Sequence, residues 1–319
     1  MNKIKLYAMR HLRKIIILLF FAGLFSFTRH ADPTDAASLG EMLFNDPILS
    51  SDQSVHCASC HIPRFAFSDT VAFSKGVAGL GTRNTPGITN MDARPFFFWD
   101  GRAKTLEEQV LGPIENQQEM NLPLPVALER LRNDERYGRY FQAVFGKKPD
   151  STNLAVALAA FVRTLETGDA PFDDWMQGNK TAISASAVRG RTIFLNKGKC
   201  FDCHFGPDFT GDEFRNIGLY NGKDLNDLGR FNQTKKEEDK GKFKVPGLRN
   251  TALTAPYMHN GQFKTLKEVI DYYDRPDHFG LHSIGRDTLL QRPLQLTETE
   301  KEDLEAFLNA LTDKRFLNH

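Results

Sequence analysis

The 319-residue sequence lacks a large excess of one charge, an apolar run long enough to span a membrane, and a long strand-like pattern. Its charges nearly cancel, with 41 basic and 40 acidic residues, and this balance argues against a nucleic-acid partner. The apolar run at residues 15–27 is shorter than the roughly 20 residues of a membrane-spanning helix, so a permanent anchor is disfavoured. No alternation of apolar and polar residues is long enough to indicate a substantial sheet. The chain is nevertheless 40% hydrophobic, which excludes a wholly disordered protein.

The N-terminus has the composition of a secretory signal. Five basic residues and no acidic residue occur among the first 14 positions, and the apolar run follows directly. A basic stretch followed by a short apolar stretch is typical of export signals. We therefore predict a signal peptide at residues 1–30, with cleavage near residues 26–31, although no clean small-x-small cleavage site follows the run.

All four cysteines belong to two copies of one motif. Residues 57–61 read Cys-Ala-Ser-Cys-His, and residues 200–204 read Cys-Phe-Asp-Cys-His. In such a motif both cysteines can form thioethers with the vinyl groups of a haem, and the histidine can then bind the iron. The sequence therefore predicts two covalently bound c-type haems and redox chemistry. The predicted haem-binding residues are Cys57, Cys60 and His61 in the first copy and Cys200, Cys203 and His204 in the second.

Other uses of paired cysteines fit this spacing less well. The halves of a zinc site usually lie roughly 12 to 20 residues apart, whereas 140 positions separate Cys60 from Cys200. A disulfide or a thioredoxin-like pair does not need the histidine that follows both motifs. Covalent haem attachment takes place outside the cytoplasm, so the motifs agree with the export signal. We expect a periplasmic protein, with an uncleaved membrane anchor as the alternative.

The two motifs belong to a longer internal repeat. In each half a glycine-containing helical segment precedes the motif, an Arg-Asn-Thr follows it, and a Gly-x-x-Lys-Thr-Leu-x-Glu segment comes last. The paired copies are Gly40–Phe44 and Gly190–Phe194, Arg83–Thr85 and Arg249–Thr251, and Gly101–Glu108 and Gly261–Glu268. A repeat of this size with one metal centre per copy predicts an all-α fold of two tandem cytochrome c-like domains, each with one covalently bound haem.

Helical periodicity supports this fold and helps to locate the domains. An apolar stripe runs from Leu154 to Leu165 at helical spacing, and Thr152 or Asn153 can cap its start. A second stripe near the C-terminus follows a capping-box pattern. Between the stripes, glycine and proline interrupt the helical pattern at residues 167–181. We therefore place an N-terminal domain at residues 31–167 and a C-terminal domain at residues 168–319.

The repeat also allows the two predicted haem sites to be compared. The residue twelve positions beyond the aligned glycine is Pro113 in the first half and Tyr273 in the second. Proline has no side-chain donor atom, whereas a tyrosine phenolate can bind ferric iron. If this position faces each iron, the first haem is open to a ligand such as peroxide, and the second is six-coordinate and suited to holding electrons.

The sequence resembles the bacterial di-haem cytochrome c peroxidases and their MauG-type relatives over nearly all of the chain after the signal. Six motifs in a fixed order carry the resemblance. They are the two Cys-x-x-Cys-His motifs, Arg83–Pro86, Phe98–Arg102, the segment from Gln109 to Met120, and Ala255–Gly261. The resemblance makes the first haem the peroxide site and the second the electron-storing site.

Several further residues acquire roles from the resemblance alone. It implies that Glu119 is the distal acid–base carboxylate, that Gln109 is the distal amide beside it, and that Trp99 relays electrons between the haems. It also implies one calcium ion between the domains. The calcium ligands would be the side-chain oxygen of Asn84 and the carbonyl oxygens of Thr254 and Pro256.

The sequence departs from the family pattern at two places. Many of these peroxidases carry a histidine shortly before Arg-Asn that closes the peroxide haem until the other haem is reduced, but Ser74–Thr82 contains none. Reductive activation is therefore not expected. The peroxidases usually have methionine where this chain has Tyr273, and tyrosine is the choice of MauG-like enzymes. Because methionine ligation raises a haem potential, tyrosine at position 273 should lower it. Met258 stays open as a competing ligand.

These observations predict a peroxidase that reduces hydrogen peroxide to water with electrons from a small redox protein, a cytochrome c or a cupredoxin. Six basic and no acidic residues lie in the first 30 positions, so residues 31–319 carry a net charge of −5, which suits a small basic donor. Two alternatives stay open: a MauG-like oxidase that modifies a protein or organic substrate, and a non-catalytic di-haem electron carrier. A homodimer is also compatible with the resemblance, and no nucleic-acid partner is expected.

Overall fold

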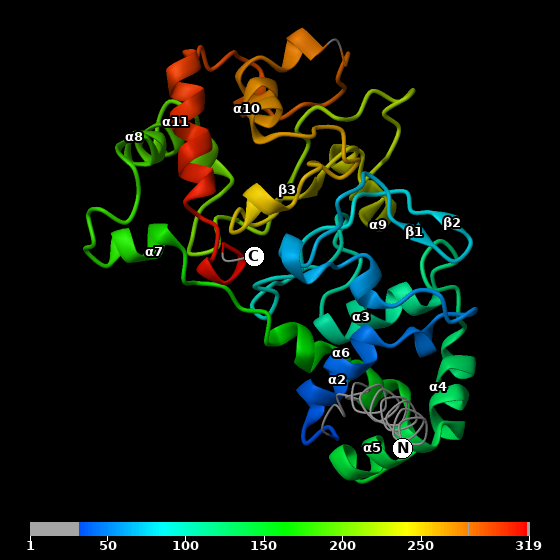
Figure 1. The fold of residues 1–319 in the computed structure, drawn as a ribbon. Coiled ribbons are helices and arrows are strands. Elements are labelled where there is room, and N and C mark those ends of the chain that lie inside the picture. Colours follow the sequence, from blue (N-terminus) through cyan, green and yellow to red (C-terminus); the bar gives the residue numbers. More distant parts are fainter. Residues whose placement is uncertain (1–31, 280, 318–319) are drawn as a thin grey trace, which may run out of the picture. The chain divides into compact units, whose positions relative to one another are not determined.

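The computed structural model describes residues 32–279 and 281–317. The predicted signal peptide lies outside the described residues. The chain from Pro33 onward groups into one compact unit, so the domain boundary at residue 167 stays a prediction. Helices make up most of the regular structure (Figure 1). The helices are α2 (Ala36–Asn45), α3 (Leu106–Glu115), α4 (Leu124–Asn133), α5 (Glu135–Phe145), α6 (Ser151–Arg163), α7 (Pro171–Met176), α8 (Ala185–Leu195), α9 (Phe231–Thr234), α10 (Leu266–Asp274) and α11 (Glu298–Asn309).

Sheet structure is limited, in the part of the chain that is described, to two antiparallel pairs of strands, each strand two residues long. Strand β1 (Lys75–Gly76) pairs with β2 (Gly79–Leu80), and β3 (Phe214–Arg215) pairs with β4 (Phe243–Lys244). The prediction of a mainly helical chain with little sheet is confirmed.

Two close helix crossings repeat between the halves. Helix α2 packs against α6, and α8 packs against α11 (Figure 1). A Cβ atom on Gly40 would lie 1.9 Å from the carbonyl oxygen of Ala157, and one on Gly190 would lie 1.8 Å from that of Asp303. Only glycine permits such contact between the backbones. The repeated glycine of the sequence therefore marks the point where each pair of helices touches.

The Thr-Leu-x-Glu segments begin two equivalent helices, as the repeat predicts. The hydroxyl of Thr105 caps α3 by accepting from the Glu108 amide at 3.1 Å, and Thr265 caps α10 through Glu268 at the same distance. A side-chain oxygen on the cap satisfies an amide that has no partner inside the helix. Both helices therefore begin at the same point of the repeat.

Local details differ from expectation in two places. Helix α6 is capped by Asp150, whose carboxylate accepts from the Asn153 amide at 2.8 Å, rather than by Thr152 or Asn153. A carboxylate reaches the free amides of the first turn and also favours the positive end of the helix dipole. The interrupted stretch 167–181 contains the short helix α7, because Pro171 is suited to the first position of a helix.

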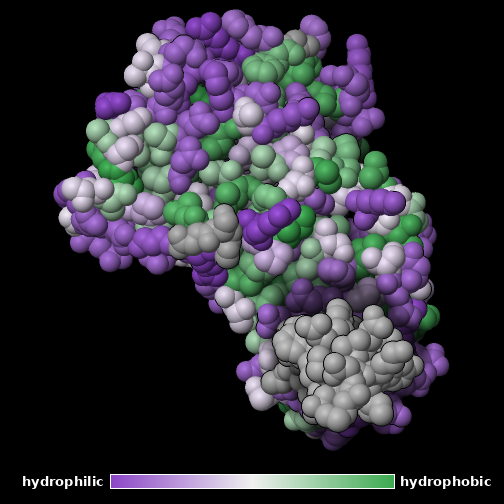
Figure 2. All heavy atoms as spheres, viewed as in Figure 1, coloured by the Kyte–Doolittle hydropathy of each residue, from purple (hydrophilic) through white to green (hydrophobic). Residues whose placement is uncertain are grey.

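The core is formed mainly by side chains of the helices. One buried cluster includes Leu43, Tyr137 and Leu154, and another includes Phe194, Leu304 and Phe307. On the face drawn in Figure 2, hydrophilic residues predominate and hydrophobic ones lie between them. Within the described ranges no helix combines the length and the apolar character that a membrane span requires.

We expect Gly40→Ala and Gly190→Ala each to lower the free energy of unfolding by about 1–3 kcal/mol, because the added methyl group forces the crossing helices apart. Gly138→Ala in α5 is the matched control, since its nearest neighbour would lie 3.8 Å away. That control should be neutral or slightly stabilising. Denaturant unfolding followed by circular dichroism measures the difference. Equal stability of Gly40→Ala and Gly138→Ala would contradict the close contact.

Candidate active site

One cavity of about 1060 Å³ contains both Cys-x-x-Cys-His motifs in its wall. The structure brings every site residue predicted from the sequence to this wall. They are Cys57, Cys60, His61, Asn84, Trp99, Gln109, Glu119, Cys200, Cys203, His204, Thr254, Pro256, Met258 and Tyr273. The fold therefore brings together residues that lie more than 200 positions apart in the sequence. Their individual roles stay predictions.

The two motif histidines have the same environment. The Nδ1 atom of His61 lies 3.0 Å from the carbonyl oxygen of Phe67, and that of His204 lies 3.0 Å from the carbonyl of Phe209. A carbonyl can only accept, so Nδ1 carries the proton and Nε2 keeps its lone pair for a metal. Burial lowers the pKa of both imidazoles, which favours the neutral form that binds metals.

The cysteines are positioned by short turns of 3₁₀-helix at Cys57–Ser59 and Cys200–Asp202. All four lie at the cavity wall, and none of them is joined in a disulfide. Each histidine amide donates to the carbonyl of the first cysteine of its motif at 2.9 Å, so the thiols and the imidazole share one compact turn. This donor set, with its oriented imidazole, fits a covalently bound haem at each motif.

The first motif faces a carboxylate. Burial raises the pKa of the Cys57 and Cys60 thiols, and Glu119 lies close enough for its charge to add a smaller rise to both. Asn116 donates through Nδ2 to Glu119 Oε1 at 2.6 Å, which leaves Oε2 for another partner. Burial raises the pKa of Glu119, while the Asn116 hydrogen bond and the nearby Arg102 oppose that rise.

Helix α3 supplies the rest of this wall. Gln109 and Pro113 project from α3 into the same cavity, four residues apart and therefore on one face of the helix. Pro113 offers the cavity only carbon atoms. The cavity wall thus combines an amide and a carboxylate with an apolar surface.

The second motif faces a phenol instead. Tyr273 occupies the position in α10 that Pro113 occupies in α3, and the thiols of Cys200 and Cys203 are near enough to affect its titration. Burial raises the pKa of the Tyr273 hydroxyl. Met258 lies on the same cavity wall and packs in the apolar cluster around Tyr272. Both residues therefore stay candidates for the second haem.

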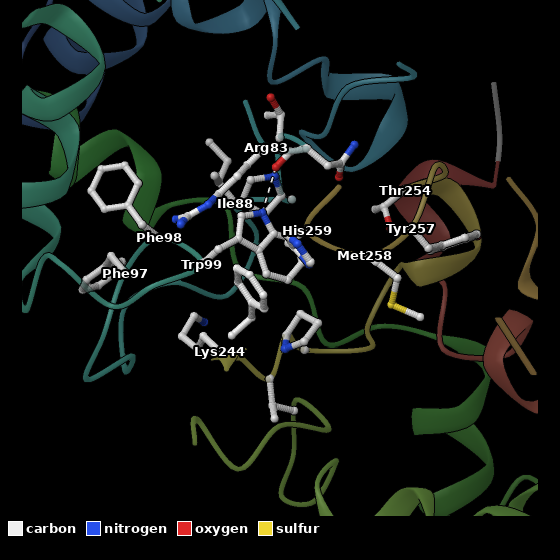
Figure 3. A pocket seen from close by; sticks show the side chains of 18 of the residues that line it. Arg83, Ile88, Phe97, Phe98, Trp99, Lys244, Thr254, Tyr257, Met258 and His259 are labelled. Atoms are coloured by element: carbon white, nitrogen blue, oxygen red, sulfur yellow. Dashed lines mark hydrogen bonds between the residues drawn. The ribbon is translucent and has the colours of Figure 1, made fainter. Parts of the chain in front are cut away.

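Trp99 is held between the two halves of the chain. Its indole Nε1 donates to the carbonyl of Asn84 at 2.8 Å, and its own carbonyl accepts from the Lys244 amide at 2.8 Å. Its ring lies beside His259, edge to face, with 6.5 Å between the centroids (Figure 3). These contacts from both halves hold the ring at the cavity wall.

The structure adds a charged cluster that sequence reasoning missed. Arg83 donates to both carboxylate oxygens of Asp227, at 2.7 and 2.8 Å, and to Asp100 at 2.8 Å. His259 stacks on Phe243 with 3.6 Å between centroids, and burial lowers its pKa to about 4. The repeat could have drawn attention to His259, because it lies 160 positions after Trp99, the offset of the aligned glycines.

Asn84 has an arrangement that suits a cation ligand. The residue is buried, and its amide nitrogen donates to the carbonyl of Val71 at 3.1 Å, so the amide oxygen points elsewhere. Thr254 and Pro256 share the cavity wall with it. Amide and carbonyl oxygens are the ligands that a hard cation such as calcium prefers.

Known proteins are similar to this chain in sequence and in fold. Residues 34–181 match the family described as di-haem cytochrome c peroxidase. The chain is 38% identical over 281 residues to methylamine utilization protein MauG of Methylorubrum extorquens, covering 87% of this chain and 78% of that protein. It is 37% identical over 290 residues to cytochrome c peroxidase Ccp of Escherichia coli, covering 88% of this chain and 59% of that protein. A crystal structure of a MauG-like protein associated with microbial copper homeostasis superposes with a TM-score of 0.79 at 29% identity, over 92% of this chain and 96% of that one.

A mainly helical chain with two Cys-x-x-Cys-His motifs on one cavity defines the class of di-haem c-type cytochrome enzymes. The chain belongs to the di-haem cytochrome c peroxidase family, which includes the MauG-like proteins. Membership implies two c-type haems and oxidoreductase chemistry on peroxide. The resemblance stated from the sequence is thereby confirmed.

The raised pKa of Glu119 gives a testable pH dependence. We expect its carboxyl to titrate above the ordinary value of 4.5, and Asn116→Leu to raise the pKa further by removing the hydrogen bond that favours the carboxylate. Because ionising a buried carboxyl is unfavourable, the folded protein should lose some stability as pH rises through this range. Infrared difference spectroscopy of the protonated carboxyl measures the midpoint, with Glu119→Gln as the blank. A midpoint at or below 4.5 would contradict the burial of the group.

Proposed function

We propose that this protein is a periplasmic di-haem peroxidase that reduces hydrogen peroxide to water with electrons from a small redox protein. One observation carries the proposal: the two motifs share a cavity but face different side chains. Glu119 is near enough to Cys57 of the first motif, and Tyr273 to the cysteines of the second, for each pair to interact electrostatically, and Pro113 lines the same cavity. This asymmetry supports a peroxide site at the first motif and an electron-holding site at the second.

The bound haems would supply the redox-active iron, held through Nε2 of His61 and of His204. Glu119 would accept a proton from one peroxide oxygen and return it to the other as the O–O bond breaks. Its position next to Asn116 leaves Oε2 for that exchange. A positioned acid–base group typically contributes about 10²- to 10⁴-fold to the rate. Gln109 would orient the peroxide through its amide.

The reaction consumes two electrons and two protons for each hydrogen peroxide and yields two water molecules. We propose that a cytochrome c or a cupredoxin supplies the electrons at the second haem and that Trp99 relays them to the first. The hydrogen bonds of Trp99 to both halves of the chain support this role, because a fixed ring keeps its distance to each site constant.

Several features complete the proposal. The chain would consist of an export signal at 1–30 and cytochrome c-like domains at 31–167 and 168–319. The proposal also includes the association of two copies of the chain as a homodimer. One calcium ion would bind the oxygens of Asn84, Thr254 and Pro256, supported by the orientation of the Asn84 amide. The family relatives named above support a haem enzyme of this kind.

A second candidate function is a MauG-like oxidase that modifies a protein or organic substrate. Tyr273 favours it, because tyrosine is the residue that MauG-like enzymes have at this position. A peroxidase should oxidise a reduced cytochrome or cupredoxin rapidly with peroxide, whereas the oxidase should not. A non-catalytic electron carrier would show no response to peroxide at all.

We expect Glu119→Gln to lower the peroxidase kcat by about 10²- to 10⁴-fold while both haems stay attached, because the amide cannot accept the proton. Glu115→Gln is the matched control, since Glu115 is an exposed residue of α3 away from the cavity wall. Stopped-flow oxidation of a reduced donor protein measures kcat, and the pyridine haemochrome assay measures haem content. Unchanged turnover in Glu119→Gln would remove the residue from the mechanism.

We expect Tyr273→Phe to change the low-spin signals of the second haem, whereas Met258→Leu should leave them unaltered, because the phenolate is the preferred sixth ligand. Electron paramagnetic resonance and optical spectra of the oxidised protein distinguish the two variants. A methionine-to-iron absorption band that disappears in Met258→Leu would reverse the assignment.

A further inference from the structure

The hairpin formed by β1 and β2 touches the backbone of the segment that carries Glu119. A Cβ atom on Gly76 would lie 2.0 Å from the carbonyl oxygen of Gln118 and 2.6 Å from that of Glu119. Contacts below 3.0 Å are essentially never made by real Cβ atoms. The neighbours here are backbone carbonyls, which cannot rotate away as the end of a flexible side chain can. Position 76 therefore admits only glycine without movement of Glu119.

A hydrogen bond fixes the same contact. The amide of Val77 donates to the carbonyl oxygen of Glu119 at 2.8 Å. On its other side, the Glu119 amide donates to the carbonyl of Asn116 at 3.0 Å, and Asn116 also holds the carboxylate. The backbone of Glu119 is thus bound at its carbonyl by the hairpin and at its amide by the loop after α3.

The hairpin is itself anchored at its base. The hydroxyl of Ser74 donates to Asp69 at 2.5 Å and lies 2.7 Å from the hydroxyl of Thr85. Ser74 and Asp69 are both buried. A hairpin of two-residue strands has little stability of its own, so these buried hydrogen bonds contribute to holding it in place.

We propose that Gly76 is a positioning residue for Glu119: the backbone contact between the hairpin and residues 118–119 sets where the carboxylate lies in the cavity. The expected effect on catalysis rests on the proposed peroxidase function. The backbone contact between Gly76 and residues 118–119 does not depend on that function. It assigns a role to the stretch before Arg83, which lacks the histidine of many relatives. Here that stretch holds the acid–base group through backbone atoms.

The chain offers a matched control in the same hairpin. A Cβ atom on Gly81 would meet its nearest neighbours, carbonyl oxygens of Arg83 and Ser74, at 3.7 Å, which is ordinary van der Waals contact. Gly81→Ala therefore adds the same methyl group to the same loop without touching residues 118–119. Gly79 is unsuitable, because its φ of +146° would strain any other residue.

In the holoenzyme, Gly76→Ala should lower kcat for peroxide roughly 10- to 100-fold, because a displacement of about 1 Å at a catalytic group has this effect. The KM for the donor protein should not change, and Gly81→Ala should match the wild type. Combined with Glu119→Gln, Gly76→Ala should cause no further loss, since the carboxylate through which it acts is gone. A full additional loss in the double variant would overturn the proposal.

A readout independent of turnover keeps the two proposals separate. Hydrogen exchange of the wild-type holoprotein should show the Val77 amide protected, and Gly76→Ala should remove that protection while Gly81→Ala keeps it. Rapid exchange at Val77 in the wild type would refute the positioning contact, even if Gly76→Ala fails to fold. A wild type with protected Val77 but no peroxide turnover would refute the proposed function and leave the contact standing.

Discussion

The geometry of the whole site depends on one hydrogen bond that is made twice, from a motif histidine to a main-chain carbonyl. Because His61 and His204 each give their Nδ1 proton to the backbone, both imidazoles are fixed as the same tautomer with Nε2 available. The proximal sides of the two sites are therefore equivalent. The two halves differ at one corresponding helix position, which is Pro113 in α3 and Tyr273 in α10.

The fold was largely accessible from the sequence because its signals are local. A threonine followed three residues later by glutamate predicts the start of α10, and the structure has that capping box. The repeated glycines at 40 and 190 mark the helix crossings, and the lack of period-two patterns agrees with two pairs of very short strands. The cysteine spacing alone predicts the residues that hold haem, and the structure places them on one cavity.

The remaining features depend on contacts that no local pattern encodes. The closeness of Gly76 to Gln118 is a meeting of two backbones, 42 positions apart, and backbone atoms are the same in every residue. The cluster around Arg83 joins side chains of common types from distant segments. The stretch from Lys235 to Lys244 reads as a solvated loop, yet Lys244 is mostly buried at the cavity wall and lies 3.8 Å from Asp212. Composition cannot distinguish that lysine from its exposed neighbours.

The pairing of Arg83 with Asp227 joins positions 144 apart, whereas the turn that orients His61 needs only the six residues up to Phe67. Contacts between distant positions form later in folding than local ones, since a long loop must first be closed. The turn that orients His61 can therefore form before the Arg83–Asp227 pair closes the cavity wall. We therefore expect the thiols to be accessible before the cavity is enclosed as the protein assembles.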